Sequence, residues 1–340
     1  MSEKKYRIAI LGASGNVGRL LLDLLIKREF PYESIKLLAS KRTAGEKIEA
    51  KDGNTYTIEE TSHESFSNVD IVLASAGSSV SKEYADTIVK AGAVIIDNSS
   101  AFRMDPNVPL VVPEVNADAL KEHKGIIANP NCSTAPLVCV LKPLAEKYGV
   151  ERVVVSTYQS ISGAGKDAME ELKESSRKVL NGENYEPKHI NKKLAFNLIP
   201  HIDVFMDNGY TKEEVKVIDE SRKILGIPDL KITCTAVRVP VLISHSESVN
   251  IQLKSPSFVK EFKEIISSNP NIRVLDDPSQ DVYPMPIMAT GKDPTFVGRI
   301  RVDESQENTF NLWLVSDNLR KGAALNTIQI AESMVKQGII

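Results

Sequence analysis

The stretch RIAILGASGNVGRLLLDLLIK, residues 7–27, places an apolar run, a glycine-rich turn and an amphipathic segment in immediate succession. The run RIAIL has the length of a buried strand, and residues 17–28 carry the apolar spacing of a helix. Three glycines lie in the turn and the start of the helix: Gly12, Gly15 and Gly18. Glycines there allow a tight turn and let the backbone approach a pyrophosphate at a helix N-terminus. The stretch therefore predicts a strand–turn–helix unit that binds a dinucleotide, with a ligand-free tight turn as the alternative.

The same alternation continues through the first 150 residues. A further helix is expected near 80–91, and further strands are expected at 35–39, 71–75, 94–97, 110–113 and 126–129. Strands that are apolar throughout indicate a parallel sheet covered on both faces. Strand–helix alternation of this kind is typical of a doubly wound α/β domain. We expect a Rossmann-like dinucleotide-binding domain over residues 1–130.

The pattern changes in the second half of the chain. A long strand is expected at 153–161, and the runs at 231–239, 248–253 and 309–316 alternate with a period of two. Such alternation predicts an antiparallel or mixed sheet with one open face. Helices are expected at 167–180, 211–225, 257–268 and 323–337. We expect an α+β domain with a mixed sheet over residues 131–317, and a C-terminal helix, about 318–340, that packs back onto the first domain.

Composition excludes several classes of protein. The 340 residues are 42% apolar and 26% charged, with a net charge of -3, which argues against a nucleic-acid partner bound through a basic surface. The apolar runs are shorter than a membrane span, and the first residues contain no apolar signal region. Three cysteines without a CxxC spacing argue against a disulfide framework and against a zinc or other metal site. We expect a cytoplasmic protein with reduced thiols, no membrane partner and no metal.

The end of the second strand indicates which dinucleotide is bound. NAD sites usually place an acidic residue there to hold the ribose hydroxyls, but no carboxylate lies between Ile35 and Gly45. The segment ASKRTAG, 39–45, instead offers hydroxyl and guanidinium groups, which suit a 2′-phosphate. A solvated basic loop is the alternative. We expect NADP, bound by Gly12, Ser14, Gly15, Asn16, Val17, Ser40, Arg42 and Thr43.

One cysteine has the surroundings of a nucleophile. Cys132 lies in NPNCST, 129–134, directly before a strong helix pattern, where unpaired N–H groups and the helix dipole stabilise a thiolate. Among five histidines, His245 in RVPVLISHSES, 238–248, has the best context for a proton acceptor. Cys139 and Cys234 lie in apolar runs and are expected to pack in the core. For Cys132 itself, a small buried residue without chemistry is the alternative.

Seven blocks of this sequence resemble the short form of the aspartate-β-semialdehyde dehydrogenases. The resemblance runs over nearly the whole chain in the family's order: GASGNVG, ASKRTAG, NSSAFRM (98–104), NPNCST, YQSISGAG (158–165), RVPVLISHSES and DNLRKGAALNTIQIAE (317–332). It implies reversible, NADPH-dependent reduction of β-aspartyl phosphate to aspartate semialdehyde and phosphate through a cysteine thioester. The product would serve lysine, diaminopimelate, threonine and methionine synthesis. The second domain would be catalytic and would also form a homodimer, with a tetramer left open.

The resemblance also implies a role for each matching residue. Cys132 would be the acyl nucleophile, Gln159 would orient the intermediate, and His245 would be the acid/base. Substrate groups would be held by Arg238 at the α-carboxylate, Glu213 at the amino group, and Arg103 and Lys216 at phosphate. Glu214 is a near-equivalent choice to Glu213, and Asn131 or nearby N–H groups could hold the oxyanion. The nicotinamide would be lined by Ser162, Gly163 and Asn318.

Three other functions compete with this interpretation. N-acetyl-γ-glutamyl-phosphate reductases perform the same chemistry one carbon longer, but they tend to carry glycine directly before the cysteine, where this chain has Asn131. Glyceraldehyde-3-phosphate dehydrogenases carry a serine before the cysteine. A non-catalytic NADP-sensing module would keep the fold, but such copies usually lose a member of the thiol, histidine and arginine set.

Overall fold

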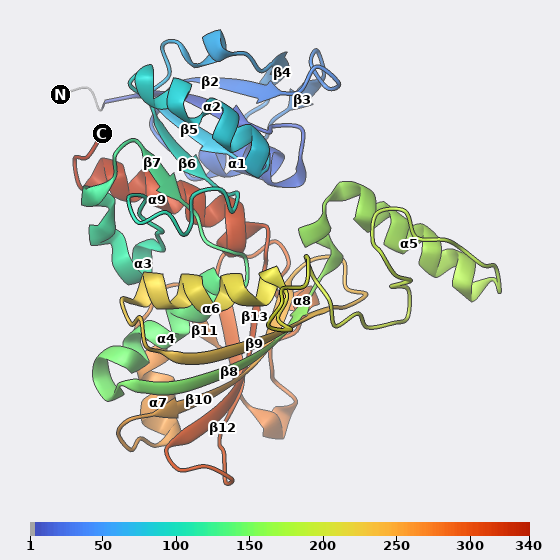
Figure 1. Cartoon of the computed structure of the whole chain (residues 1–340), viewed down its shortest axis with the longest axis vertical. Helices are drawn as coiled ribbons and strands as arrows, with labels where there is room; N and C mark the ends of the chain where they lie inside the picture. Colours follow the sequence, from blue (N-terminus) through green and yellow to red (C-terminus); the bar gives the residue numbers. More distant parts are fainter. Residues whose placement is uncertain (1–3) are drawn as a thin grey trace. The chain divides into compact units, whose positions relative to one another are not determined.

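The computed structural model describes residues 4–340, so the first three residues of the predicted domain 1–130 lie outside the described residues. The chain forms two compact units (Figure 1). One runs to Asn131 and also contains Ala323–Ile340, and the other is Cys132–Gly322. Within residues 4–340, no helix has the length and apolar character that crossing a membrane requires.

The first unit contains a seven-stranded sheet in the order β3-β4-β2-β1-β5-β6-β7. Its neighbouring strands pair in parallel, except for the antiparallel pair β3 and β4. The strands are β1 (Tyr6–Leu11), β2 (Tyr32–Ala39), β3 (Lys47–Glu49), β4 (Thr55–Glu60), β5 (Ile71–Ala74), β6 (Val94–Asp97) and β7 (Ile126–Ala128). Parallel strands and crossover helices of this kind define a doubly wound dinucleotide-binding fold.

Helices cover both faces of this sheet, which explains why its central strands are apolar throughout. Helices α1 (Asn16–Lys27) and α9 (Leu325–Lys336) share one core cluster with β1, β2 and β5. Helix α2 (Ser78–Lys90) packs in the cluster on the other face with Phe66. The remaining helical segments are α3 (Pro113–Asn116) and the 3-10 turns His63–Phe66 and Ala117–Glu122.

The second unit contains a six-stranded mixed sheet in the order β11-β12-β13-β10-β8-β9. The pairs β8–β9 and β11–β12 are parallel, and the other neighbours are antiparallel. The strands are β8 (Val150–Gln159), β9 (Lys231–Arg238), β10 (His245–Leu253), β11 (Ile272–Val274), β12 (Thr295–Val302) and β13 (Thr309–Ser316). The predicted fold class, an α/β domain followed by an α+β domain with a mixed sheet, is confirmed.

One face of this second sheet is covered by helices. Helix α6 (Lys212–Leu225) packs along β9 and against α4 (Thr134–Tyr148), which in turn contacts α7 (Val259–Ile266). Helix α5 (Lys166–Leu180) extends away from the sheet as a separate arm (Figure 1). The shorter helical segments are α8 (Pro286–Ala289), the 3-10 turns Ile161–Ala164 and Pro278–Gln280, and the π-helical turn Arg320–Ala324. Along β8 and β9, buried residues alternate with more exposed ones, as period-two sequences require.

Several predicted elements differ from the structure. Residues 110–113 do not form a strand: Leu110 makes an isolated bridge to Ala128, and Pro113 begins α3. Prolines 109 and 113 flank the segment and cannot donate to a sheet, which leaves too few residues for a strand. Strands β3, β4, β11 and β12 were not predicted from the sequence. Strands β3 and β11 are only three residues long, too short for a period to be visible.

Candidate active site

Cys132 lies where the backbone turns into a helix. Helix α4 begins two residues later, at Thr134, and the Cys132 side chain is partly exposed, whereas Cys139 and Cys234 are buried. The position agrees with the expectation of a thiol at a helix N-terminus. Gly322 packs directly against Cys132, because a Cβ added at Gly322 would stand 2.7 Å from the Cβ of Cys132.

Strand pairing brings His245 to the thiol. His245 is the first residue of β10, and the antiparallel neighbour β8 ends at Gln159, so the two strand ends meet. Nε2 of His245 lies 3.3 Å from Sγ of Cys132. The ring is 1% exposed, and burial, reinforced by the positive charge of Arg238, lowers the pKa of His245 well below its ordinary value. The nucleophile and the histidine predicted from sequence are therefore in contact.

The far side of the imidazole faces a buried polar network. Nδ1 of His245 accepts the backbone N–H of Ser160 at 3.0 Å, and Ser160 Oγ also lies 3.0 Å from Nδ1. Oδ1 of Asn318 accepts from the Ser160 hydroxyl at 3.2 Å and from the Ser162 hydroxyl at 3.0 Å. The backbone N–H of Ser244 donates to the same oxygen. The network joins the YQSISGAG segment to the segment that follows β13.

Arg238 is the last residue of β9 and lies beside Ser160. Parallel pairing places it opposite Gln159, and its Nη1 donates to the backbone carbonyl of Ser160 at 2.7 Å. Burial lowers the pKa of Arg238, while Glu213 and Cys132 act in the opposite direction, so all three lie within electrostatic range. Arg238 also lines a pocket of about 460 Å³ with residues 189–192, 199 and 201–205. This concave space beside a guanidinium could receive a small anionic molecule.

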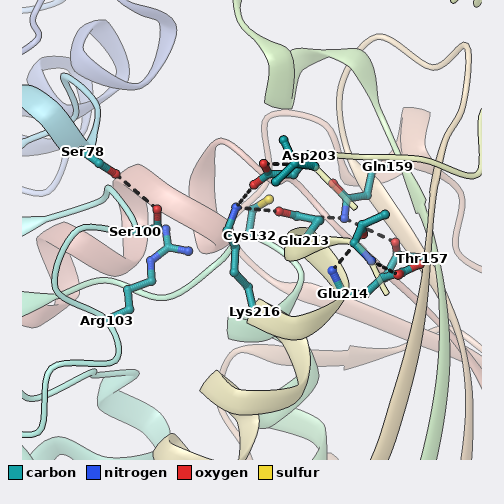
Figure 2. A network of polar contacts seen from close by, with 12 residues as sticks. Ser78, Ser100, Arg103, Cys132, Thr157, Gln159, Asp203, Glu213, Glu214 and Lys216 are labelled. Carbon is teal, nitrogen blue, oxygen red and sulfur yellow. Dashed lines mark hydrogen bonds and ion pairs between the residues drawn. The ribbon is translucent and has the colours of Figure 1, made fainter. Parts of the chain in front are cut away.

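A chain of polar contacts runs from β8 to helix α6 (Figure 2). Gln159 Nε2 donates to Glu213 Oε1 at 3.1 Å and to Thr157 Oγ1 at 3.3 Å. Lys216 Nζ lies 3.2 Å from Glu213 Oε2 and 2.7 Å from Asp203 Oδ2. Burial alone would lower the pKa of Lys216, but Glu213 and Asp203 outweigh it and raise that pKa. Gln159, Glu213 and Lys216 are thus brought together as expected, and Asp203 joins them without a sequence signal.

The structure distinguishes the two adjacent glutamates of α6. Glu214 closes a capping box with Thr211: its Oε2 accepts the Thr211 backbone N–H at 2.6 Å, and Thr211 Oγ1 accepts the Glu214 N–H. Oε1 of Glu214 accepts the backbone N–H of Ala236 on β9 at 2.9 Å. Both carboxylate oxygens of Glu214 therefore stabilise backbone groups, while Glu213 contacts Gln159 and Lys216.

Gly163 keeps space open beside the histidine. A Cβ added at Gly163 would lie 3.3 Å from Arg238 Nη1 and 3.6 Å from His245 Nε2. Gly163 was predicted as a site residue, whereas Ser160, Asp203 and Gly322 were not. Ser160 and Gly322 stand inside quoted motifs, so motif membership was an available signal, whereas the contact of Asp203 with Lys216 has none.

Arg103 and Asn131 belong to the first unit. Arg103 Nε donates to the Asn129 carbonyl at 2.8 Å, and its Nη2 donates to the Asn98 carbonyl at 2.7 Å. Figure 2 shows Arg103 beside the hydroxyl pair Ser78 and Ser100, whose oxygens are 3.2 Å apart. Asn131, 5% exposed, directly precedes Cys132 in the chain.

The glycine-rich turn lines a separate pocket of the first unit, about 440 Å³ in volume. Gly12 has φ +88°, and a Cβ there would stand 2.8 Å from the backbone of Ser75. At Gly18 a Cβ would stand 2.3 Å from the Gly12 carbonyl oxygen, so the turn and α1 pack too closely for a side chain. Gly15 immediately precedes α1 and lies in the pocket wall. The cradle therefore fits a pyrophosphate at the helix N-terminus.

The wall of this pocket contains both basic and acidic side chains, including Lys41 and Glu60. Among the predicted cofactor residues, Gly12, Ser14, Gly15 and Ser40 line it, together with Lys41. Arg42 and Thr43 are not in its wall, and Asn16 and Val17 instead form the first turn of α1. Glu60 lines the pocket from β4, because pairing sets it beside Ala39 at the end of β2. An acidic residue thus reaches this pocket from β4, a strand that was not predicted from the sequence.

Family models identify both units as parts of a semialdehyde dehydrogenase. The family model "Semialdehyde dehydrogenase, NAD binding domain" matches residues 7–123, and "Semialdehyde dehydrogenase, dimerisation domain" matches residues 141–321. Aspartate-semialdehyde dehydrogenase of Bacillus subtilis is 50% identical, with 98% of each chain covered. The chain therefore belongs to the aspartate-semialdehyde dehydrogenase family, as the sequence motifs predicted.

Solved structures agree with this assignment. The crystal structure of aspartate semialdehyde dehydrogenase II of Vibrio cholerae complexed with ASA is 42% identical, with a TM-score of 0.95 over 98% of this chain and 99% of that one. A structure of the Candida albicans enzyme with NADP is 26% identical, with a TM-score of 0.76 over 99% of this chain and 100% of that one. A nicotinamide dinucleotide is therefore the class of cofactor that the first unit accommodates.

Proposed function

We propose that this protein reduces β-aspartyl phosphate to aspartate semialdehyde and phosphate, reversibly and through a thioester on Cys132. The observation that carries the proposal is the 3.3 Å contact between Cys132 Sγ and His245 Nε2 beside the buried Arg238. A thiol, a histidine and a carboxylate-binding arginine are the groups that acyl transfer to sulfur from an acidic substrate requires.

The chemistry begins at sulfur. The Cys132 thiolate attacks the acyl carbon and phosphate leaves with the electron pair of the C–O bond. A thioester carbonyl accepts hydride more readily than a carboxylate does, which explains the use of a cysteine. The bound nicotinamide cofactor supplies that hydride. We assign the acid/base role to His245, because its Nε2 lies 3.3 Å from Cys132 Sγ.

The charged groups around Cys132 match the groups of the substrate. Arg238 binds the α-carboxylate through its guanidinium fork, and Glu213, tied to Gln159, binds the α-ammonium group. Gln159 orients the acyl group. We assign phosphate binding to Lys216, which contacts Glu213 and Asp203. Arg103 of the first unit is a second residue that we propose for phosphate. Asn131 or the N–H groups at the start of α4 hold the oxyanion.

NADP is the cofactor that we propose. Gly12, Ser14 and Gly15 cradle the pyrophosphate, and Ser40 in the pocket wall, with Arg42 and Thr43 following, holds the 2′-phosphate. Asn16 and Val17 extend the pyrophosphate cradle along α1. Ser162, Gly163 and Asn318 line the nicotinamide.

The cofactor choice is tested with two neighbouring cations. Arg42→Ala should raise the KM for NADP and leave the use of NAD almost unchanged, because only NADP carries the 2′-phosphate. Lys41→Ala is the matched variant, since Lys41 lines the pocket. If Lys41→Ala alone affects NADP, then Lys41 replaces Arg42 in the proposal. Equal loss with both cofactors in both variants would contradict a 2′-phosphate site here.

We also propose that the protein is a homodimer in the cytoplasm, formed through the second unit. The match to a dimerisation domain over residues 141–321 supports self-association. Sedimentation analysis distinguishes a dimer from a tetramer.

The function is tested by following NADPH formation from aspartate semialdehyde, phosphate and NADP. We expect turnover with aspartate semialdehyde and none with N-acetylglutamate semialdehyde, which tests the reductase alternative. Protein quenched with β-aspartyl phosphate and no NADPH should carry an acyl adduct on the peptide containing Cys132. Cys132→Ser should bind NADP, lack the adduct and show almost no turnover. An adduct on Cys139 or Cys234, or full activity in Cys132→Ser, would contradict the mechanism.

A further inference from the structure

Lys216 lies between two carboxylates, and only one of them is fixed in place. Nζ of Lys216 is 2.7 Å from Asp203 Oδ2 and 3.2 Å from Glu213 Oε2 (Figure 2). The Glu213 side chain is 8% exposed, and its Oε1 accepts the side-chain amide of Gln159. The Asp203 side chain is 30% exposed, and its Oδ1 accepts the backbone N–H of the next residue, Val204. Asp203 is therefore the partner that Lys216 can exchange.

The charges of this cluster oppose the binding of an anion. Two carboxylates outnumber the one ammonium group, and they face two of its three N–H donors. Lys212 is a further cation near Asp203, but its side chain is exposed. Since Glu213 and Asp203 raise the pKa of Lys216, the ammonium group keeps its charge. A phosphate group that binds Lys216 therefore competes with a carboxylate that is already there.

We propose that Asp203 is a competing counter-ion of Lys216 that limits the affinity of the protein for phosphate. The phosphate group takes the place of Asp203 Oδ2 at Nζ, and Asp203 returns to Lys216 as phosphate departs. Phosphate is a product when aspartate semialdehyde is formed, so this return favours its release. The inference rests on the assignment of phosphate to Lys216 in the function proposed above. It adds a residue that acts on phosphate through Lys216.

A pocket next to Asp203 provides the space that this exchange requires. Asp203 lines the pocket of about 460 Å³ together with Lys192 and His201, which are basic. A carboxylate that turns away from Lys216 therefore enters a polar, open space and is not forced into the apolar core. Glu213 has no such route, because it is buried and held by Gln159.

The backbone around Asp203 is attached to the start of α6 independently of the ion pair. The carbonyl of Val204 accepts the backbone N–H of Lys212 at 2.8 Å, and Phe205 forms an isolated antiparallel bridge with Thr211. Asp203 has φ +67°, in the left-handed region that Asp, Asn and Gly adopt more readily than other residues. The side chain can therefore move, or be replaced by Asn or Gly, while the segment stays in place.

The test compares phosphate affinity in Asp203→Asn and in the parent protein. Asn keeps the shape and the backbone conformation but removes the negative charge. We expect the KM for phosphate, measured with saturating aspartate semialdehyde and NADP, to fall about fivefold. The KM for aspartate semialdehyde should change less than about twofold, because its ammonium and carboxylate charges balance. Calorimetric titration of the protein alone with inorganic phosphate should show the same gain in affinity.

Asp207→Asn is the matched control, because it removes the same charge from the same segment at an exposed position. It should leave phosphate affinity unchanged, whereas Asp203→Gly, which also suits φ +67°, should reproduce the gain. A gain in affinity cannot arise from loss of the fold. An equal gain in Asp207→Asn would overturn the proposal. Weaker phosphate binding in both Asp203 variants would also overturn it, because Asp203 would then orient Lys216 for phosphate.

Lys216→Gln distinguishes failure of this inference from failure of the phosphate site itself. If Lys216→Gln weakens phosphate binding while both Asp203 variants bind phosphate as the parent does, this inference alone is wrong. If Lys216→Gln also binds phosphate as the parent does, the assignment of phosphate to Lys216 is wrong as well. The acyl adduct on Cys132 is measured separately, so the thioester mechanism is judged on its own result.

Discussion

Cys132 is placed by its neighbours as much as by its own turn. Gly322 lies so close that even one methyl group would overlap the Cβ of Cys132. On the other side, His245 contacts the sulfur. Gly322 therefore restricts the Cα and Cβ of Cys132, and the imidazole contacts its sulfur.

Gly322→Ala is expected to reduce turnover sharply while the protein remains folded. The added Cβ would stand 2.7 Å from the Cβ of Cys132 and must displace it. A shift of about 1 Å at a reacting group costs on the order of 10²-fold in rate. The measurement is kcat together with the rate at which iodoacetamide alkylates Cys132. Unchanged kcat in Gly322→Ala would show that Cys132 has room to move.

The residue types alone predicted the thiol and the histidine, because a cysteine before a helix and a histidine at a strand end have recognisable local signals. They could not predict that Ser160 approaches Nδ1, since a serine in a motif carries no sign of which backbone group is used. The motif that contains Gly322 gave no sign of its close approach to Cys132, because such an approach depends on where a segment distant in the chain lies.

At the scale of elements, three strand ends bring together the reacting groups. Gln159, Arg238 and His245 stand at the ends of β8, β9 and β10, which are neighbours in one sheet. Because β9 is parallel to β8 and β10 is antiparallel, the end of β9 and the start of β10 lie at the same edge. Helix α6 packs against β9 and places Glu213 in contact with Gln159 and Lys216.

The adjacent residues Glu213 and Glu214 of helix α6 are expected to have different roles, one in substrate binding and the other in stability. Glu214→Gln weakens the capping box with Thr211 and the contact to Ala236, so it should cost about 1 kcal/mol of unfolding free energy with little change in KM. Glu213→Gln should leave stability nearly unchanged and raise the KM for aspartate semialdehyde. Denaturant unfolding followed by the single tryptophan, Trp313 in the second unit, and steady-state kinetics measure the two effects. The opposite pattern would contradict the assignment of Glu213 to the substrate.

At the scale of the whole molecule, the second unit buries an acid in its core. Glu247 is 0% exposed, and neither of its carboxylate oxygens has a hydrogen-bond partner within residues 4–340. Burial raises the pKa of Glu247 well above 4.5. The folded state therefore keeps a proton on Glu247 at pH values where the unfolded chain has released it.

This buried acid predicts how stability depends on pH. Above about pH 4.5 the unfolded state binds fewer protons at this site, so the contribution of Glu247 falls by about 1.4 kcal/mol per pH unit until the folded pKa is reached. Glu247→Gln removes this slope and should make the protein more stable at pH 7. Exposed Glu264→Gln is the control and should change nothing. Unfolding free energies from pH 5 to 8 provide the test, and parallel curves for Glu247→Gln and the parent would contradict it.

The sequence by itself determined the fold class, the glycine turn, the position of Cys132 before a helix and the family. These features depend on local patterns, namely apolar periodicity, glycine spacing and contiguous motifs. Such patterns can be recognised in the sequence because the residues that form each one lie close together in the chain. The predicted domain bounds, residues 1–130 and 131–317, stay a prediction.

Only the tertiary structure decided which groups meet. It distinguished Glu213 from Glu214 through hydrogen bonds to separate partners, brought Asp203 to Lys216, and set Glu60 beside Ala39 in the cofactor pocket. It also directed the Ser160 N–H at His245. Each of these contacts joins segments that are distant in the chain or depends on the exact direction of a bond. Strand register and helix packing determine such geometry, and neither leaves a periodic trace in the sequence.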